Sequence, residues 1–226
     1  MSSLPPLLSS ELSSLLSPVI KGPALLPIIQ ADTPDDAVAI AKALQDGGVG
    51  SVEVVLRTPQ ALAAITAIRS ALPNLLVGAG TVLTAADAKA CKDAGAQFLV
   101  SPASTPKLLE AMIDTGLPLA PGVATPSEIA MAYEYGLREV KFFPAHLSGG
   151  IEMLKALSGV FQQVKFCPTG GIGQHNLADF LALPNVFVAG GSWLTPANLV
   201  KNQHWAQISE LAAAASAIAR QIKTAA

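Results

Sequence analysis

Short apolar runs alternate with alanine- and leucine-rich stretches along almost the whole chain of 226 residues. Successive runs begin about 20 to 27 residues apart, which is the length of one strand, one helix and two loops. Strands that alternate with helices predict a parallel sheet with right-handed crossovers, and eight units predict an α/β fold, a (β/α)8 TIM barrel. The eight apolar runs are residues 24–29, 51–56, 75–80, 96–101, 117–122, 139–144, 164–170 and 186–191.

The competing fold is an open, doubly wound parallel sheet, which carries a G-x-G-x-x-G turn after its first strand. Here the first apolar run is followed by QADTPDD (residues 30–36), which contains no glycine. The stretch TPDDAVAIAKALQDGG is typical of a helix, because Thr33 fits the N-cap, Pro34 the first turn and Gly47 the C-terminal stop. The sequence therefore favours the barrel.

No shift in composition divides the chain, so we expect a single TIM-barrel domain over residues 1–226. Residues 1–18 are expected to form a helical extension with a short helix over residues 10–17, and residues 204–226 a C-terminal helix on the outside of the barrel. The N-terminus lacks the basic region of a signal peptide, and no apolar run approaches the roughly 20 residues of a membrane span. We therefore expect no membrane partner. The chain has two cysteines and no CxxC pair, which agrees with a cytoplasmic protein.

Charge and histidine content exclude further classes of partner. Only 13% of the residues are charged, the formal net charge is −2, and lysines and arginines are scattered, which does not favour nucleic acid. The spacing of His146, His175 and His204 is not that of metal ligands. We therefore expect no metal, no cofactor and a small-molecule partner.

A lysine, Lys141, lies inside the sixth apolar run, although lysine is rarely buried unless it is paired or functional. Strand residues alternate between the barrel interior and the helices, and active sites lie at the carboxyl ends of the strands. Lys141 shares a face with Phe143, and Glu53 shares one with Arg57. We expect Lys141, Glu53 and Arg57 to converge in the barrel mouth, with Thr81 directly after the third run.

Less specific explanations stay open for these residues. Arg57 could be an ordinary surface arginine, Lys141 could extend out of the barrel mouth, and the lysine and glutamate could form a purely structural pair. Glu53 needs a partner in any case, because an unpaired buried carboxylate is strongly destabilising. Lys165 has the right parity to point inward, but it lies near the bottom of the barrel, where residues serve stability.

Two glycine-rich turns follow the seventh and eighth runs, PTGGI (residues 168–172) and AGGSW (residues 189–193). In a TIM barrel, backbone N–H groups of these loops frequently bind phosphate, and Thr169 and Ser192 can add hydroxyl donors. A single Gly-Gly turn is weak evidence, since glycine also serves tight turns. Two of them in this place favour a phosphate site.

A neutral lysine amine can condense with a ketone, and the protonated imine then accepts electrons from the carbon–carbon bond β to it. Apolar burial and a nearby cation both disfavour the charged amine. Glu53 could remove the proton of the leaving hydroxyl, and Arg57 could bind a carboxylate as a bidentate donor. The residues thus predict a retro-aldol cleavage of a 2-oxo acid that carries a terminal phosphate.

With these residues in place, the chain resembles the class I family of 2-keto-3-deoxy-6-phosphogluconate (KDPG) and 4-hydroxy-2-oxoglutarate (KHG) aldolases. The resemblance spans about residues 20–200 and rests on GGVGSVEVVLRT, VGAGTVL, AGAQFLVSP, YGLREVKFFPA, FCPTGGI and GGSWL. It implies a metal-free homotrimeric barrel that cleaves KDPG to pyruvate and D-glyceraldehyde 3-phosphate in the Entner–Doudoroff pathway, with KHG, cleaved to pyruvate and glyoxylate, as a further substrate. It implies that Lys141 forms a Schiff base and that Glu53 transfers protons. It further implies that Arg57 and Thr81 bind the pyruvyl carboxylate region and that Pro102 and Phe143 line the pocket. The phosphate end is implied to consist of Thr169, Gly170, Gly171, Gly191 and Ser192.

One position departs from that family, in which a glutamate often follows the FFPA segment where this chain has His146. The change is either neutral or alters the preference for the distal end of the substrate. Two other functions also fit the residues. A metal-free phosphosugar isomerase or epimerase would use Glu53 as a base without a covalent adduct, and a non-catalytic protein would only bind a phosphorylated ligand.

Overall fold

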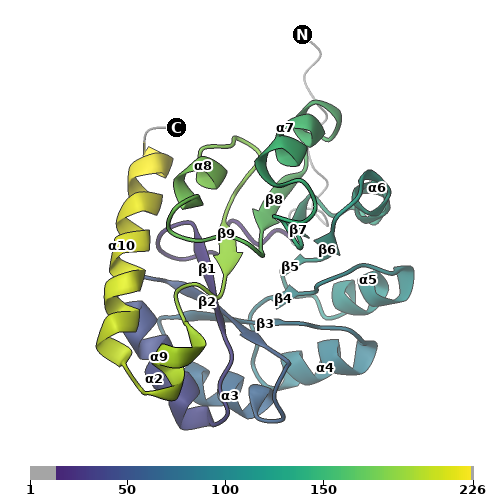
Figure 1. The fold of residues 1–226 in the computed structure, drawn as a ribbon. Coiled ribbons are helices and arrows are strands. Elements are labelled where there is room, and N and C mark those ends of the chain that lie inside the picture. Colours follow the sequence, from purple (N-terminus) through teal and green to yellow (C-terminus); the bar gives the residue numbers. More distant parts are fainter. Residues whose placement is uncertain (1–13, 225–226) are drawn as a thin grey trace.

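Parallel strands alternate with helices through residues 14–224, the part of the chain that this computed structural model describes (Figure 1). The chain adopts an α/β fold. Its strands are β1 (Leu25–Ile29), β2 (Ser51–Val55), β3 (Leu76–Gly80), β4 (Leu99–Val100), β5 (Leu119–Ala120), β6 (Gly122–Val123), β7 (Glu139–Phe142), β8 (Lys165–Pro168) and β9 (Ala189–Gly191). Its helices are α2 (Pro34–Asp46), α3 (Ala61–Ala71), α4 (Ala85–Asp93), α5 (Pro106–Ile113), α6 (Pro126–Glu134), α7 (Gly150–Val160), α8 (Leu177–Leu181), α9 (Ala197–Lys201) and α10 (Trp205–Thr224).

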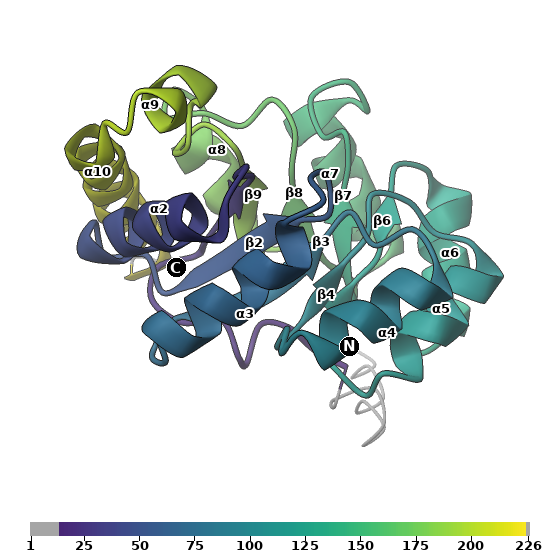
Figure 2. The ribbon, with the colours of Figure 1, turned by 90° about the horizontal axis from the view of Figure 1, so that it is seen from below.

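The strands pair in parallel, mostly with a neighbour along the chain, and β1 also pairs with β9. One sheet has the order β5-β4-β3-β2-β1-β9, and a second has the order β6-β7-β8. Isolated parallel bridges link Phe166 to Val186 and Thr169 to Gly190, so the second sheet also contacts β9. The helices lie outside the strands (Figure 2), which leaves the inner faces of the strands to pack against one another.

The strand expected over residues 117–122 is divided in two. Pro121 separates β5 from β6, because proline has no N–H to donate to a ladder. Its carbonyl still accepts a hydrogen bond of 2.8 Å from the N–H of Lys141. β5 pairs with β4 whereas β6 pairs with β7, so this proline marks the change from one sheet to the other.

Threonine side chains begin four of the helices. Thr33, Thr84, Thr105 and Thr125 each accept a hydrogen bond from the backbone N–H three residues further on, which stabilises each helix by about 1 kcal/mol. The N-cap at Thr33, followed by Pro34, confirms the start that the sequence predicts for α2. The last helix, α10, forms within the expected C-terminal range and packs along α2 (Figure 1). Among residues 14–224, no helix combines the length and the apolarity that a membrane crossing requires.

The buried apolar residues form two clusters, one on the outer faces of the strands and one on the inner faces. The larger cluster joins strand residues to buried residues of the helices, such as Val54 to Ile40 and Ile65. The smaller cluster contains no helical residue and lies on the inner faces. Its members are Leu16, Leu26, Leu76, Phe98, Val100, Ala120, Cys167 and Val188.

The segment that precedes β1 supplies one of these inner residues. Leu16 is fully buried, and Glu139 accepts hydrogen bonds of 2.6 and 2.8 Å from the backbone N–H groups of Leu16 and Ser17. Leu119 donates a further bond to the carbonyl of Ser14. Because Glu139 and Leu119 are the first residues of their strands, the segment lies across the amino ends of β5 and β7.

Of the N-terminal helix expected over residues 10–17, only residues 14–17 belong to the described part of the chain, and these form turns and bends. Residues 1–13 lie outside the described residues.

Replacing Glu139 by alanine should destabilise the fold by about 2–4 kcal/mol, because two backbone N–H groups, one of them buried, lose a charged acceptor. Urea unfolding followed by circular dichroism measures the change. Glu210→Ala is the matched control, since Glu210 is exposed on α10, and its effect should stay within about 0.5 kcal/mol. Equal losses in the two variants would contradict the role of Glu139.

Candidate active site

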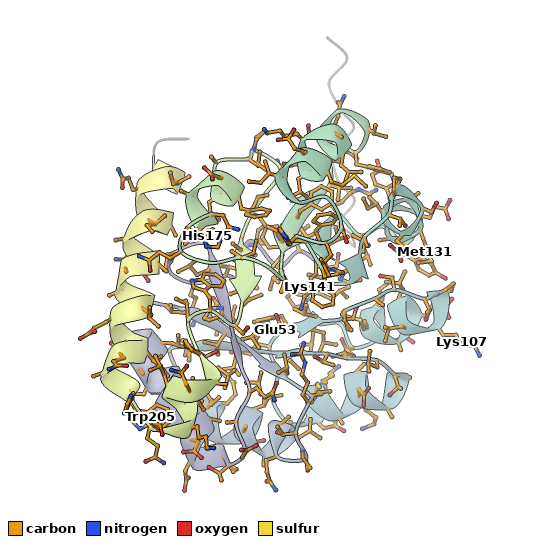
Figure 3. The ribbon with its side chains drawn as sticks, in the orientation of Figure 1. Glu53, Lys107, Met131, Lys141, His175 and Trp205 are labelled. Carbon is orange, nitrogen blue, oxygen red and sulfur yellow. The ribbon has the colours of Figure 1, made fainter. Side chains whose placement is uncertain are left out.

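Lys141 lies at the centre of the strands, in register with Gly122 of β6 and Cys167 of β8. Only 3% of its surface is exposed. Its Nζ donates a hydrogen bond of 3.1 Å to Oε1 of Glu53, and Figure 3 shows the two side chains pointing toward one another from opposite sides of the inner space. The structure thus brings together two of the three residues that were expected to converge.

Glu53 on β2 is fully buried, and one of its carboxylate oxygens is free. Its Oε2 has no hydrogen-bond partner within the described residues. The glycine at the end of β3 makes room for this side chain, because a Cβ on Gly80 would lie 1.9 Å from Glu53 Oε1. A buried carboxylate with one oxygen held by an amine and the other free can accept a proton from a bound molecule.

Two further side chains surround the Lys141 amine. The Phe143 ring lies 5.3 Å from Nζ, measured to its centroid, and Cys167 faces the same inner space. Burial raises the pKa of the Cys167 thiol to about 12, with Lys141 acting in the opposite direction and Glu53 adding to the increase. Cys167 is therefore a neutral, apolar neighbour of the amine.

Arg57 follows the end of β2 and is exposed. It lines a cavity of about 740 Å³ together with Ser192 and Ile28. Ile28 pairs with Glu53 in the register of β1 and β2, so one residue of the cavity lining is the strand neighbour of Glu53. Arg57 thus lies on the open side of the site rather than within it.

Thr81 directly follows β3 and has a φ of 59°, in the left-handed region. A β-branched residue adopts this conformation only at a cost of about 1–3 kcal/mol, and such strain gathers at functional sites. Pro102, half-buried after β4, packs its backbone against Gly122, where a Cβ would lie 2.2 Å from the Pro102 carbonyl carbon. Both residues lie at the carboxyl ends of strands, which was expected for Thr81.

The turn after β8 contains three of the residues that were expected to form a phosphate end. Thr169 is buried, and Gly170 and Gly171 have φ values of 94° and 79°, which only glycine adopts freely. His146 donates its backbone N–H to the Gly170 carbonyl at 3.0 Å, which ties the loop after β7 to this turn. Near β9, Gly191 packs against Trp193, and Ser192 is exposed.

Lys165 lies apart from this site, as its position in the sequence predicts. It is the first residue of β8, it is exposed, and its Nζ donates to the Pro184 carbonyl at 2.8 Å. Within residues 14–224, no group of three or more His, Cys, Asp or Glu side chains could hold a metal ion.

Two neighbours of the Lys141–Glu53 pair were not predicted from the sequence. Gly80 carried a signal, because a glycine inside a strand often marks the close approach of another group. The pairing of Cys167 with Lys141 depends on the register of β7 and β8, which the sequence does not specify.

Comparison with known proteins places this site in a family. A sequence profile of the KDPG and KHG aldolases matches residues 16–211. The chain belongs to the KDPG and KHG aldolase family. It is 46% identical over 187 residues to the 2-dehydro-3-deoxy-phosphogluconate aldolase of Pseudomonas aeruginosa, which covers 83% of this chain and 85% of that protein. The KHG/KDPG aldolase of Escherichia coli K12 is 46% identical over 188 residues, 83% of this chain and 88% of that protein.

A solved structure supports the same assignment. The KDPG aldolase of Legionella pneumophila superposes with a TM-score of 0.85 and 45% identity, covering 88% of this chain and 97% of that one. In that crystal structure, pyruvate was captured at low pH as a covalent carbinolamine intermediate.

Both cysteines should resist thiol reagents in the native protein at pH 8. Cys91 and Cys167 are buried, and burial raises the pKa of each to about 12. The stability that the neutral thiols contribute is present below about pH 9 and is lost as the pH rises toward 12.

Titration with DTNB should detect no reactive thiol before denaturation and two after it, and a Cys91→Ser variant should leave Cys167 equally protected. Rapid native labelling of Cys167 would contradict this account of the site.

Proposed function

We propose that this protein is a class I aldolase that cleaves 2-dehydro-3-deoxy-6-phosphogluconate to pyruvate and D-glyceraldehyde 3-phosphate. The observation that carries the proposal is the buried contact of 3.1 Å between Lys141 Nζ and Glu53 Oε1, with Glu53 Oε2 free to take a proton. Membership of the KDPG and KHG aldolase family supports the same chemistry. The KHG/KDPG aldolase of E. coli supports 4-hydroxy-2-oxoglutarate, cleaved to pyruvate and glyoxylate, as a second substrate.

The covalent step begins with the amine of Lys141. Glu53 takes a proton from the ammonium group, and the neutral amine adds to the C2 ketone to form a carbinolamine. Glu53 returns its proton to the carbinolamine hydroxyl, which leaves as water, and a protonated imine remains. The captured carbinolamine of the Legionella relative supports this sequence of events.

The cleavage step uses the same carboxylate. Glu53 removes the proton of the C4 hydroxyl, the C4 oxygen becomes the aldehyde carbonyl, and the C3–C4 bond breaks. The electron pair of that bond passes to C3 and the imine, which yields an enamine with a neutral nitrogen. Glu53 then delivers its proton to C3, and water hydrolyses the imine to pyruvate and free Lys141.

The remaining residues bind the substrate in this proposal. Arg57 and Thr81 hold the carboxylate of the 2-oxo acid, and Pro102 and Phe143 line the pocket around the ketone. The phosphate rests on the backbone of the two glycine-rich turns, with hydroxyl donors beside it. These turn residues are Thr169, Gly170, Gly171, Gly191 and Ser192.

We further propose that the strands close into a (β/α)8 barrel and that residues 1–226 form one domain. We also propose that the protein is cytoplasmic and forms a homotrimer. The parallel pairing of β1 with β9 and the bridge between Thr169 and Gly190 support closure. Two free, buried cysteines agree with a reducing compartment. The products fit a place in the Entner–Doudoroff pathway, and the imine serves as the electron sink that the cleavage requires, without a metal or a cofactor.

Borohydride reduction in the presence of pyruvate should attach the pyruvyl group to Lys141, because the imine forms on that amine. Tryptic mass spectrometry locates the adduct. Lys141→Met should show none while its unfolding transition stays in place. A folded protein that binds ligand without forming an adduct would overturn the proposal in favour of an isomerase, an epimerase or a non-catalytic binding protein.

Gly80→Ala should lower kcat by about a hundredfold, because the new Cβ would lie 1.9 Å from Glu53 Oε1 and displace the carboxylate from its working geometry. The matched control is Gly159→Ala on α7, where a Cβ meets nothing within 4 Å. This control should keep full activity and gain up to about 1 kcal/mol of stability. Pyruvate release, coupled to lactate dehydrogenase, measures kcat in both variants, and equal rates would contradict the role given to Gly80.

A further inference from the structure

We infer that Lys201 is a binding residue for the terminal phosphate of the substrate and sets the preference for phosphorylated 2-oxo acids. The inference rests on the proposed function and adds a residue to its distal end. It starts from an imbalance of charge, since the five residues of the proposed phosphate end are threonine, glycine and serine. A phosphate monoester carries about 1.5 to 2 negative charges at neutral pH, and none of these five side chains carries a positive one.

The cavity of about 740 Å³ supplies the missing cation. Ser192, at the end of the proposed phosphate site, lines this cavity, and so does Lys201, the last residue of α9. Arg57 is the other cation of the lining, and the proposed reaction uses it at the carboxylate end of the substrate. Lys201 has no ion pair or hydrogen bond of its side chain within residues 14–224, so its amine is available to a ligand.

The loop that carries α9 is fixed against the first strand. Thr195, only 9% exposed, donates its hydroxyl to the Ile28 carbonyl at 2.7 Å. Beyond α9, Gln203 has a left-handed φ of 53° and donates its side-chain amide to Asp36 at 3.3 Å, which ties the end of α9 to the start of α2. Lys201 is therefore held on the wall of the cavity between two anchored points.

Two carboxylates also line the cavity, and they differ in their hydrogen-bond partners. Both oxygens of Asp36 accept hydrogen bonds from neutral donors, the hydroxyl of Thr33 and the side-chain amide of Gln203. Asp32 is exposed and has no side-chain partner among the described residues. Asp32 therefore opposes an anion in this cavity while Lys201 attracts it, and replacing the two residues should have opposite effects.

Steady-state kinetics at pH 8 with two substrates tests the assignment. Lys201→Met should raise KM for 2-dehydro-3-deoxy-6-phosphogluconate about tenfold and leave kcat unchanged, since a charge-assisted contact is lost equally from the ground and transition states. KM for 2-dehydro-3-deoxygluconate, the same chain without its phosphate, should not change. Asp32→Asn should lower KM for the phosphorylated substrate, and both effects should shrink at high salt.

The control variant is Lys107→Met, which removes the same charge from an exposed position on α5, far from Lys141 in Figure 3. Its KM values should match those of the native protein. Equal changes for both substrates in Lys201→Met, or no change at all, would overturn the assignment. Failure of the proposed function is a different result, because the native protein would then form no pyruvyl adduct on Lys141.

Discussion

The buried pair of Lys141 and Glu53 is the interaction around which the inner space of the strands is arranged. Two opposite charges lie 3.1 Å apart where almost no surface is exposed, and one carboxylate oxygen has no partner within the described residues. Removing charges from water is costly, and an apolar pair of similar volume would often be at least as stable. The chain keeps these charges and also gives up a side chain at Gly80 to hold them. Stability alone does not account for that arrangement, whereas the proton transfer proposed for Glu53 does.

A second buried carboxylate, that of Glu139, has a structural role in the same fold. Glu139 stands at the amino end of β7, and its Oε2 accepts two backbone N–H groups from the segment that precedes β1. Glu53 is the third residue of its strand, and one of its oxygens has no partner among residues 14–224. The amino ends of the strands are thus closed by a satisfied acid and by buried Leu16, while the carboxyl ends keep a cavity. This division between a stabilising end and a working end is general for parallel α/β folds of this kind.

The alternation of strands and helices and the meeting of Lys141 with Glu53 could be predicted from the sequence, because both follow from periodicity. Parity along a strand fixes which residues face inward, and the carboxyl ends gather at one edge. What could not be predicted depends on contacts between distant segments. The split at Pro121, the placement of Leu16 on the inner faces and the left-handed Thr81 all arise from how strands meet. Arg57 shares its parity with Glu53 yet is exposed beyond the strand end, where parity no longer governs direction.

The cation proposed to bind the phosphate, Lys201, differs from the buried pair in its exposure to solvent. In the proposed reaction both Lys141 and Glu53 change their protonation, and their burial strengthens each electrostatic effect. A phosphate keeps its charge from substrate to product, so a cation beside it contributes the same energy in every state. Such a cation serves best when it is exposed, because solvent weakens its attraction and the product can leave. Lys201, exposed on the wall of the cavity while the neutral turns supply directed N–H groups, meets that requirement. In the proposed function, chemistry and substrate preference are therefore carried by separate residues.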